Sequence, residues 1–285
     1  MSSLIVLNST HIVNNGYNNT LRYTFGNSAV NFSNMEIAVA GIQLYNSQFN
    51  INSTLYGNNT FQIIVPYGAT TSTISITLPN GYYSYADIQN YVASKLIAAG
   101  AYLIDSNGNN VIYFNISENS TYYGCQIDLL PTPLSLPTGW SLPASGLYST
   151  GVPTGGYAPQ IIIPSGFNLI VGYQVATFPP SRQTTAQSFL SSFTPQVNPV
   201  SSFLVRCNLV NNPYTSVPDV LTTFTSQNTT IGDLIDVRYP EYSWVEISDG
   251  SRPYIEVIIC DQNYNIVKFE DSQILIQLII RPKKN

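Results

Sequence analysis

The sequence predicts an all-β protein, a single jelly-roll β-sandwich with one short helix and long loop insertions. Three observations lead to this fold class. Short runs of β-branched and aromatic residues recur along the 285 residues and are bounded by Asn, Gly and Pro, as in strands joined by turns. Only one segment has helical periodicity. The chain has no internal repeat, so a double jelly roll is not expected at this length.

The predicted strands fall into three groups along the chain. The first comprises Ser3–Leu7, Leu21–Phe25, Glu36–Tyr45, Phe61–Pro66 and Thr73–Leu78. The second comprises Val111–Asn115, Gly124–Leu129, Gln160–Ile163, Asn168–Ala176 and Ser202–Leu209. The third comprises Asp219–Phe224, Ser243–Ile247, Tyr254–Cys260 and Gln273–Ile280. Turn residues separate several of them, at Pro79-Asn80-Gly81, Ser106-Asn107-Gly108 and Ser248-Asp249-Gly250.

The last strand, Gln273–Ile280, is an apolar run interrupted only by glutamine, and it stops before Arg281-Pro282. A continuous apolar run is typical of a strand that is buried on both faces or covered by a partner subunit. We therefore expect this segment to be a central strand of the sandwich.

The single predicted helix covers residues 85–98. Ser84 is placed as its N-cap, with Asp87 three residues later in a capping-box arrangement. Apolar residues then recur at helical spacing, and Gly100 occupies a position suited to the C-terminal cap. The pattern predicts an amphipathic helix packed on a sheet.

Two stretches rich in Pro, Gly, Ser and Thr, Pro131–Pro164 and Phe178–Pro199, are too long for simple hairpins. The first is either an ordered excursion or a mobile surface loop. We therefore expect one domain over residues 1–285, with residues 130–200 as an insertion within it.

The composition is apolar but poor in charge. Hydrophobic residues make up 44% and charged residues only 9% of the chain, and the net charge is −5. A low charge is typical of a subunit whose surface is covered by neighbours, because burying Tyr, Asn and Thr costs less than burying unpaired charges. A secreted or cell-surface protein can have the same composition. The negative net charge argues against nucleic-acid binding over the whole surface.

The sequence carries no targeting or metal-binding pattern. The start, MSSLIVLNST, lacks the basic region of a signal peptide, and no apolar stretch approaches a membrane span, so we expect a soluble product made in the cytosol. Cys125, Cys207 and Cys260 are odd in number and widely spaced, which predicts free buried thiols and neither disulfides nor zinc.

Catalytic patterns are also missing from the sequence. His11 is the only histidine and lies in a polar stretch, which excludes two-histidine metal sites and favours an exposed or interface side chain over a triad member. No phosphate-binding loop is present. Two acidic pairs, Asp233 with Asp236 and Glu270 with Asp271, are interpreted as turn residues, with glycosidase carboxylates as the alternative. We expect no catalytic, cofactor-binding or metal-binding residues, no cofactor and no enzymatic activity.

Clustered aromatic residues are the remaining candidates for function. Tyr82-Tyr83-Ser84-Tyr85 and Tyr122-Tyr123 flank the helix and a strand, and Trp140 lies in the first Pro-rich stretch. Core packing or subunit contact is the favoured interpretation, and a sugar-binding platform is the alternative.

Several segments, in order along residues 60–285, resemble the minor capsid (penton) proteins of virophages and polinton-like viruses. They are LPNGYYSYADIQNYVASKLIAAGAYLID, NVIYFNISENSTYYGCQIDLLPTPLSLPTGW, PQIIIPSGFNLIVGY, SSFTPQVNPVSSFLVRCNLVNN and WVEISDGSRPYIEVIICDQNYNIVKFEDSQILIQLIIR. Residues 1–60 match less clearly.

This resemblance implies a structural role. It implies a jelly-roll capsid subunit with two facing four-stranded sheets, which forms homopentamers at icosahedral vertices and is located in the virion after synthesis in a viral factory in the host cytoplasm. Partners would be further copies of the chain, a major capsid protein and a host receptor. Contact of the Arg281-Pro282-Lys283-Lys284 end with packaged DNA is the alternative to a solvated tail. A receptor- or glycan-binding fibre module is the alternative function.

Overall fold

The structure, a computed structural model, describes residues 2–26, 28–226 and 229–284. Antiparallel sheets dominate it, with two α-helices in the described part, so the all-β class is confirmed. The chain divides into two compact units. One, the terminal unit, is formed by the chain up to Phe49 and from Asn198 onward, and the other, the inserted unit, is formed by Asn50 to Val197. The structure thus differs from the expected single domain with an insertion over 130–200, because the inserted segment begins at Asn50 and has its own core.

The terminal unit contains two facing sheets, with the strand orders β1-β20-β4-β16 and β15-β14-β19-β2. Their strands are β1 (Ser3–Asn8), β2 (Thr20–Thr24), β4 (Met35–Tyr45), β14 (Phe203–Cys207), β15 (Val220–Phe224), β16 (Leu234–Arg238), β19 (Tyr254–Asp261) and β20 (Ile274–Pro282). Shorter elements are β3 (Val30–Phe32), which pairs with β18 (Gly250–Arg252), β17 (Val245–Glu246) beside β4, and the 3-10 helix η1 (Ser9–His11). Residues of both sheets form one apolar core.

The pairing of these eight main strands follows a simple rule. In chain order, the first pairs with the eighth (β1–β20), the second with the seventh (β2–β19), the third with the sixth (β4–β16) and the fourth with the fifth (β14–β15). A long antiparallel hairpin rolled into a sandwich has this pairing, which defines a jelly roll. The jelly-roll prediction is therefore confirmed for the terminal unit. In the sequence, the inserted unit lies between the third and fourth main strands of the jelly roll, β4 and β14.

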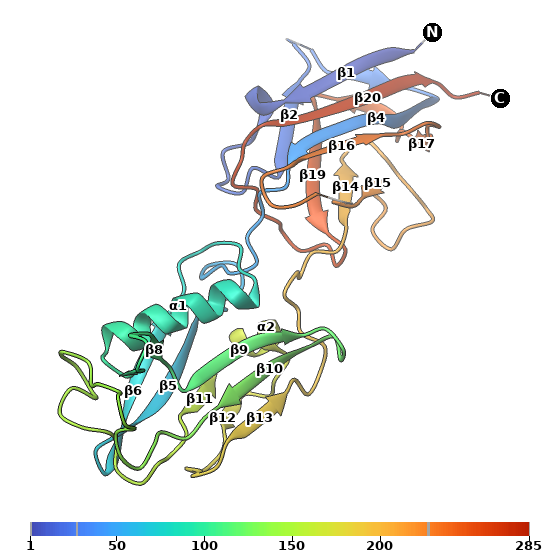
Figure 1. Cartoon of the computed structure of the whole chain (residues 1–285). Coiled ribbons are helices and arrows are strands. Elements are labelled where there is room, and N and C mark those ends of the chain that lie inside the picture. The colour runs from blue at the N-terminus through green and yellow to red at the C-terminus, as the bar shows by residue number, and fades with distance from the viewer. Residues whose placement is uncertain (1, 27, 227–228, 285) are drawn as a thin grey trace. The chain divides into compact units, whose positions relative to one another are not determined.

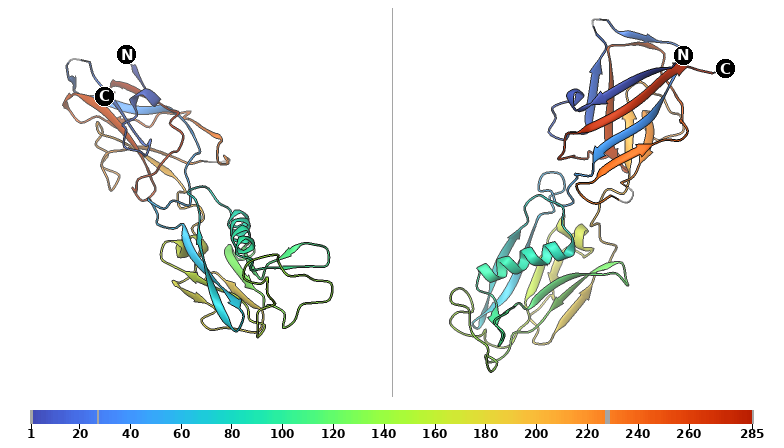
Figure 2. Two further views of the ribbon diagram at one scale, coloured as in Figure 1. Left: turned by 90° about the vertical axis from the view of Figure 1, so that its left-hand side faces the viewer. Right: turned by 45° about the horizontal axis from the view of Figure 1, so that its top comes forward.

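Strand β20 is central, as its sequence predicts, and lies between β1 and β4 (Figure 2). Its inward residues Ile274, Ile276, Leu278 and Ile280 are buried in the core between the sheets. Its outward residues, among them Leu275 and Ile279, are only half-buried. Burial of β20 is thus confirmed for its inner face, whereas its outer face is only half-buried in the isolated chain.

The inserted unit has two further sheets, with the orders β12-β11-β5-β6 and β13-β10-β9, and a small β7–β8 hairpin. Its strands are β5 (Thr60–Tyr67), β6 (Thr70–Thr77), β7 (Leu103–Ile104), β8 (Asn110–Val111), β9 (Phe114–Asn119), β10 (Gly124–Leu129), β11 (Gln160–Ile163), β12 (Ala176–Phe178) and β13 (Gln187–Leu190). Its helices are α1 (Tyr85–Ala98) and α2 (Phe167–Val171). Both sheets and both helices contribute side chains to one core.

Helix α1 has the predicted bounds and the predicted cap. The backbone N–H of Asp87 donates to Ser84 Oγ (3.2 Å), and the backbone N–H of Ser84 donates to Asp87 Oδ2 (2.9 Å). The helix packs against β9 and β6 (Figure 1). Gln89 on this helix acts as a substitute strand neighbour for β9, because its amide donates to Phe114 O (3.2 Å) and accepts from the Ile116 N–H (2.9 Å). A side chain thereby satisfies edge groups that a further strand would otherwise pair.

The predicted strand over Asn168–Ala176 is wrong. Its first half forms helix α2, and only Ala176 enters a strand, β12. A short apolar run does not distinguish a buried strand from a buried helical turn, so its flanking glycines decide. Gly166 and Gly172 both have positive φ values, and a Cβ at Gly172 would lie 2.3 Å from Phe193 O. The chain therefore turns at Gly166 and at Gly172, and the segment between these two glycines is long enough for a single short helix only.

The first Pro-rich stretch is an ordered excursion that is held by the C-terminal end of α1. The N–H groups of Leu147 and Tyr148 donate to Ala99 O and Gly100 O, each at 2.9 Å. The two backbones meet at glycines, since a Cβ on Gly146 would lie 2.5 Å from Ala99 O. Tyr148 is buried in the core of the inserted unit.

Several short or charged strands are not predicted by the sequence pattern. These are β3, β7, β12, β13, β16 and β18, and the predicted strand Val111–Asn115 is divided between the end of β8 and the start of β9. The most important omission is β16, the sixth strand of the jelly roll. Its sequence, LIDVR, carries two charged residues on a sheet edge, so it lacks the apolar pattern by which the other strands were found.

Candidate functional site

The described residues contain no group of three or more His, Cys, Asp and Glu side chains that could hold a metal ion. Within the same part of the chain, no helix is long and apolar enough to cross a membrane.

His11 has a local structural role in the described chain. It lies at the end of η1, and its Nδ1 accepts a hydrogen bond from the Asn8 backbone N–H (3.1 Å). Its ring packs edge-on against Tyr23, with 5.4 Å between the ring centres. The imidazole thus caps a turn, and its hydrogen bond within the described chain is with a backbone N–H rather than with a triad partner.

Asp233 and Asp236 have different environments. Asp233 Oδ2 accepts from the backbone N–H and the hydroxyl of Thr230, both at 2.7 Å, and these bonds lower the pKa of its carboxyl. Asp236 lies within β16, not in the predicted turn, and forms an ion pair with Arg238. The prediction of a turn residue thus agrees with the structure for Asp233 and is wrong for Asp236.

Glu270 and Asp271 also have local partners. Glu270 forms an ion pair with Lys268, and Asp271 Oδ1 accepts the backbone N–H of Gln273 (2.7 Å) just before β20. Hydrogen bonds of this kind are typical of carboxylates that form turns.

The three cysteines are buried and free. Burial raises the pKa of the Cys207 thiol to about 12 and also raises the pKa values of Cys125 and Cys260 above their usual range. Because the thiolate is the reactive form, a higher pKa leaves almost none of it near neutral pH.

We expect the folded protein to react very slowly with a thiol reagent such as dithiobis-nitrobenzoate at pH 8. In denaturant all three thiols should react within minutes, because their pKa values return to about 8.5. The measurement is the absorbance of the nitrothiobenzoate that is released with and without guanidinium chloride. Rapid reaction of one or more thiols in the native protein would contradict the burial described here.

The tyrosine clusters divide into core and surface residues. Tyr85 is buried, and its hydroxyl donates to Ile170 O (2.9 Å). Trp140 packs partly buried against the core of the inserted unit. In contrast, Tyr122 and Tyr123, in the turn between β9 and β10, are 69% and 77% exposed. Core packing is thus observed for Tyr85 and Trp140, whereas Tyr82 of the first cluster is exposed.

Charges are distributed unequally between the two units. The inserted unit contains only two basic residues, Lys95 and Arg182, and four acidic ones, Asp87, Asp105, Glu118 and Asp128. All six ion pairs of the described residues lie in the terminal unit. The surface of the inserted unit is therefore almost uncharged.

The basic C-terminal end is tied to the jelly roll. Arg281 forms an ion pair with Glu36 and stacks on Trp244, 3.7 Å from the ring centre, while Lys283 forms an ion pair with Glu246. Two of its three cationic side chains are thus already neutralised, which leaves little positive charge for phosphate contacts.

The outer face of the β1-β20-β4-β16 sheet exposes apolar side chains. On β1, Leu4 and Val6 are 60% and 40% exposed. Register places Leu4 opposite Ile279 and Val6 opposite Gln277, and Leu275 follows Gln277 on the same face of β20. Leu4, Val6, Leu275 and Ile279 thus lie on one face of neighbouring strands, with Gln277 between Ile279 and Leu275, and we call these four apolar residues the outer-face patch. Contiguous exposed apolar surface commonly marks a protein contact.

Comparisons with known proteins give likenesses to solved structures only. No family model matches the chain, and no curated protein matches it. Among solved structures, the crystal structure of the selenomethionine-labelled mavirus penton protein is similar with a TM-score of 0.43 and 10% sequence identity, over 98% of this chain and 96% of that one. A TM-score below 0.5 does not establish a shared fold, so the jelly-roll assignment depends on the strand pairing described above.

Proposed function

We propose that the chain is a structural capsid subunit that assembles through its jelly roll, most specifically a penton protein forming rings of five at the vertices of a virion. The outer-face patch is the observation that carries this proposal. Leu4 and Val6 lie in the open on an edge strand of the jelly roll, where a second subunit would bury them. In this proposal the protein has no catalytic activity, and its partners are further copies of itself and a major capsid protein.

Charge distribution supports the same function. A closed ring needs two different complementary faces on each subunit, and all contacts are then equivalent. An inserted unit with only six charged residues loses little hydration energy when neighbouring copies cover it. The resemblance of the sequence to penton proteins agrees with this reading, and DNA contact by the C-terminal end is not part of the proposal.

The experiment compares three proteins by native mass spectrometry and light scattering over a range of concentrations. We expect the natural chain to form a closed oligomer that averages as a five-fold ring in electron micrographs. Replacing Leu4 and Val6 by Ser should weaken association at least tenfold, because it removes apolar area worth about 1.4 kcal/mol or more per interface. The control is Leu134→Ser, since Leu134 is 81% exposed on the inserted unit and outside the patch.

The outcome distinguishes assembly from other roles. A natural chain that stays monomeric at high concentration, also with its major capsid protein present, would refute the proposal. Equal weakening by Leu134→Ser would show that association is nonspecific. Circular dichroism of each variant confirms that the fold is retained.

A second candidate function is glycan or receptor binding by the exposed turn between β9 and β10. Tyr122 and Tyr123 present two aromatic rings to solvent, and Tyr123 adopts a positive φ of 49°, which is uncommon for a bulky residue. A glycan array on the natural chain and on a variant with both tyrosines replaced by Ser tests it. Binding that is lost in the variant would favour this module function.

A further inference from the structure

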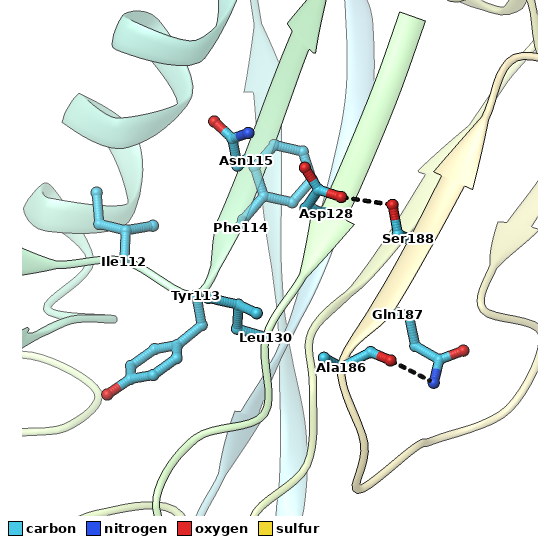
Figure 3. A pocket seen from close by; sticks show the side chains of 9 residues that line it. All are labelled: Ile112, Tyr113, Phe114, Asn115, Asp128, Leu130, Ala186, Gln187 and Ser188. Carbon is cyan, nitrogen blue, oxygen red and sulfur yellow. Dashed lines mark hydrogen bonds between the residues drawn. The ribbon is translucent and has the colours of Figure 1, made fainter. Parts of the chain in front are cut away.

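The inserted unit has a cavity of about 400 Å³ at one end of the β13-β10-β9 sheet (Figure 3). Polar side chains of the outward sheet face form one side of it, and aliphatic side chains form the other. Its lining includes Asn115, Asp128 and Ser188 on the polar side, with Ile112, Leu130 and Ala186 on the apolar side.

The polar side is a row across three strands at one register position. Asp128 on β10 pairs directly with Asn115 on β9 and with Ser188 on β13. Asp128 Oδ1 accepts from Ser188 Oγ (2.6 Å) and from Gln126 Nε2 (2.9 Å). These bonds hold the carboxylate in place, while its Oδ2 has no hydrogen-bond partner among the described residues.

Asn115 supplies a second free group beside that oxygen. Directly paired side chains of neighbouring strands have Cβ atoms about 4.5–5.5 Å apart. The amide of Asn115 forms no hydrogen bond with any residue that the structure describes, and Figure 3 shows it beside Asp128 on the same face. The free carboxylate oxygen of Asp128 and the amide of Asn115 therefore lie on one face, open to a ligand.

The carboxylate also lacks a counter-charge. Among the described residues, none that lines the cavity is basic. Of the two basic residues in the inserted unit, Arg182 stacks on Tyr157 at 3.7 Å and bonds to Ala69 O and Thr70 O, and Lys95 lies over the ring of Tyr91. Asp128 is thus a fixed negative charge that the described chain does not neutralise.

We propose that this cavity binds the side chain of a lysine or arginine of another polypeptide. The half-exposed Leu130, with Ile112, receives the aliphatic stem, and Asp128 Oδ2, beside the Asn115 amide, accepts an N–H bond from the cationic head. Long cationic side chains are amphipathic in this way, with an apolar stem and a charged tip. A charge-assisted bond to a carboxylate is also stronger than a neutral one. The inference does not depend on ring formation.

The test uses the full chain and capped tripeptides Gly-X-Gly, with X as lysine, arginine or norleucine, and methyl glucoside as a neutral polyhydroxyl probe. Ligand-observed NMR measures binding at low and at 0.5 M salt. We expect dissociation constants in the millimolar range for lysine or arginine and at least tenfold weaker binding for norleucine. The higher salt concentration should weaken binding of the cationic peptides several-fold, because the contact is partly exposed and therefore screened.

Two matched variants locate the site. Asp128→Asn keeps the shape and the acceptor for Ser188 but removes the charge, and should weaken the cationic peptides at least tenfold. Glu118→Gln removes the same charge from β9, at a residue outside the cavity, and should change binding less than twofold. Equal losses in both variants, equal binding of norleucine, or binding of methyl glucoside alone would each overturn the proposal.

Discussion

Removing residues 272–285 is expected to leave the protein insoluble or unfolded. This deletion removes β20, whose four inward residues Ile274, Ile276, Leu278 and Ile280 are buried between the two sheets. Each buried aliphatic side chain contributes about 1.5–3 kcal/mol, and their sum is comparable with the ~5–15 kcal/mol stability of a whole domain. Strand β1 pairs only with β20 in its sheet, so it would also lose its partner.

The matched control removes Lys283–Asn285 only. Among the described residues of this tail, Lys283 has an ion pair with Glu246 that is exposed and screened by solvent, and Asn285 lies outside the described residues. This shorter deletion should therefore keep the fold. Soluble yield, far-ultraviolet circular dichroism and thermal melting measure both proteins. If the chain without β20 stays soluble with an unchanged β spectrum, the jelly-roll pairing is wrong.

A pair of point variants tests the same strand more finely. Ile276→Ala, in the core, should lower the free energy of unfolding by about 2–5 kcal/mol, because it leaves a cavity. Ile279→Ala, on the half-buried outer face, should cost clearly less. Urea unfolding of the two variants compares them, and equal losses would place both faces of β20 in the core.

Residues 50–197 are expected to fold on their own. They form a compact unit with one apolar core, drawn from both of its sheets and both helices. The two ends of this segment lie together, because Asn50 Nδ2 donates to Val197 O (2.9 Å) and to Tyr83 O (2.8 Å). The two cut points therefore lie close together in the folded segment, and excision does not separate paired strands of its sheets.

The isolated segment should melt cooperatively and give a dispersed amide NMR spectrum. Its matched control is residues 68–197, which lack β5, a central strand of the β12-β11-β5-β6 sheet, and should not fold. Joining Phe49 to Asn198 through a short Gly-Ser linker should leave a folded jelly roll. An isolated segment that aggregates or melts without cooperativity would show that its core depends on the rest of the chain.

Local sequence pattern was sufficient for most elements. Helix α1 has the predicted bounds, because its cap and periodicity involve residues at most a few positions apart. Strands β10 and β11 also have the predicted bounds, Gly124–Leu129 and Gln160–Ile163. The errors fall where local signals are ambiguous or weak: the short apolar run that forms α2, and the charged edge strand β16.

Candidate sites were less predictable than strands. The sequence singled out Tyr122-Tyr123, which the structure leaves exposed, but gave no reason to choose Asp128. An isolated Asp in a strand becomes notable only when Asn115 and Ser188 are aligned beside it. A cross-strand row is a property of register, and register depends on residues far apart in the chain.

By itself, the sequence determined the β class, the single long helix, its cap and the centrality of the final strand, because alternation, caps and apolar runs act over a few residues. Only the tertiary structure decided which strands pair. Ser3 lies opposite Ile280, and a whole folding unit separates β4 from β14. Several strands have similar compositions, so the sequence of one strand does not specify its partner. The packing of the complete core selects the pairing. That selection also places the outer-face patch and the Asp128 cavity.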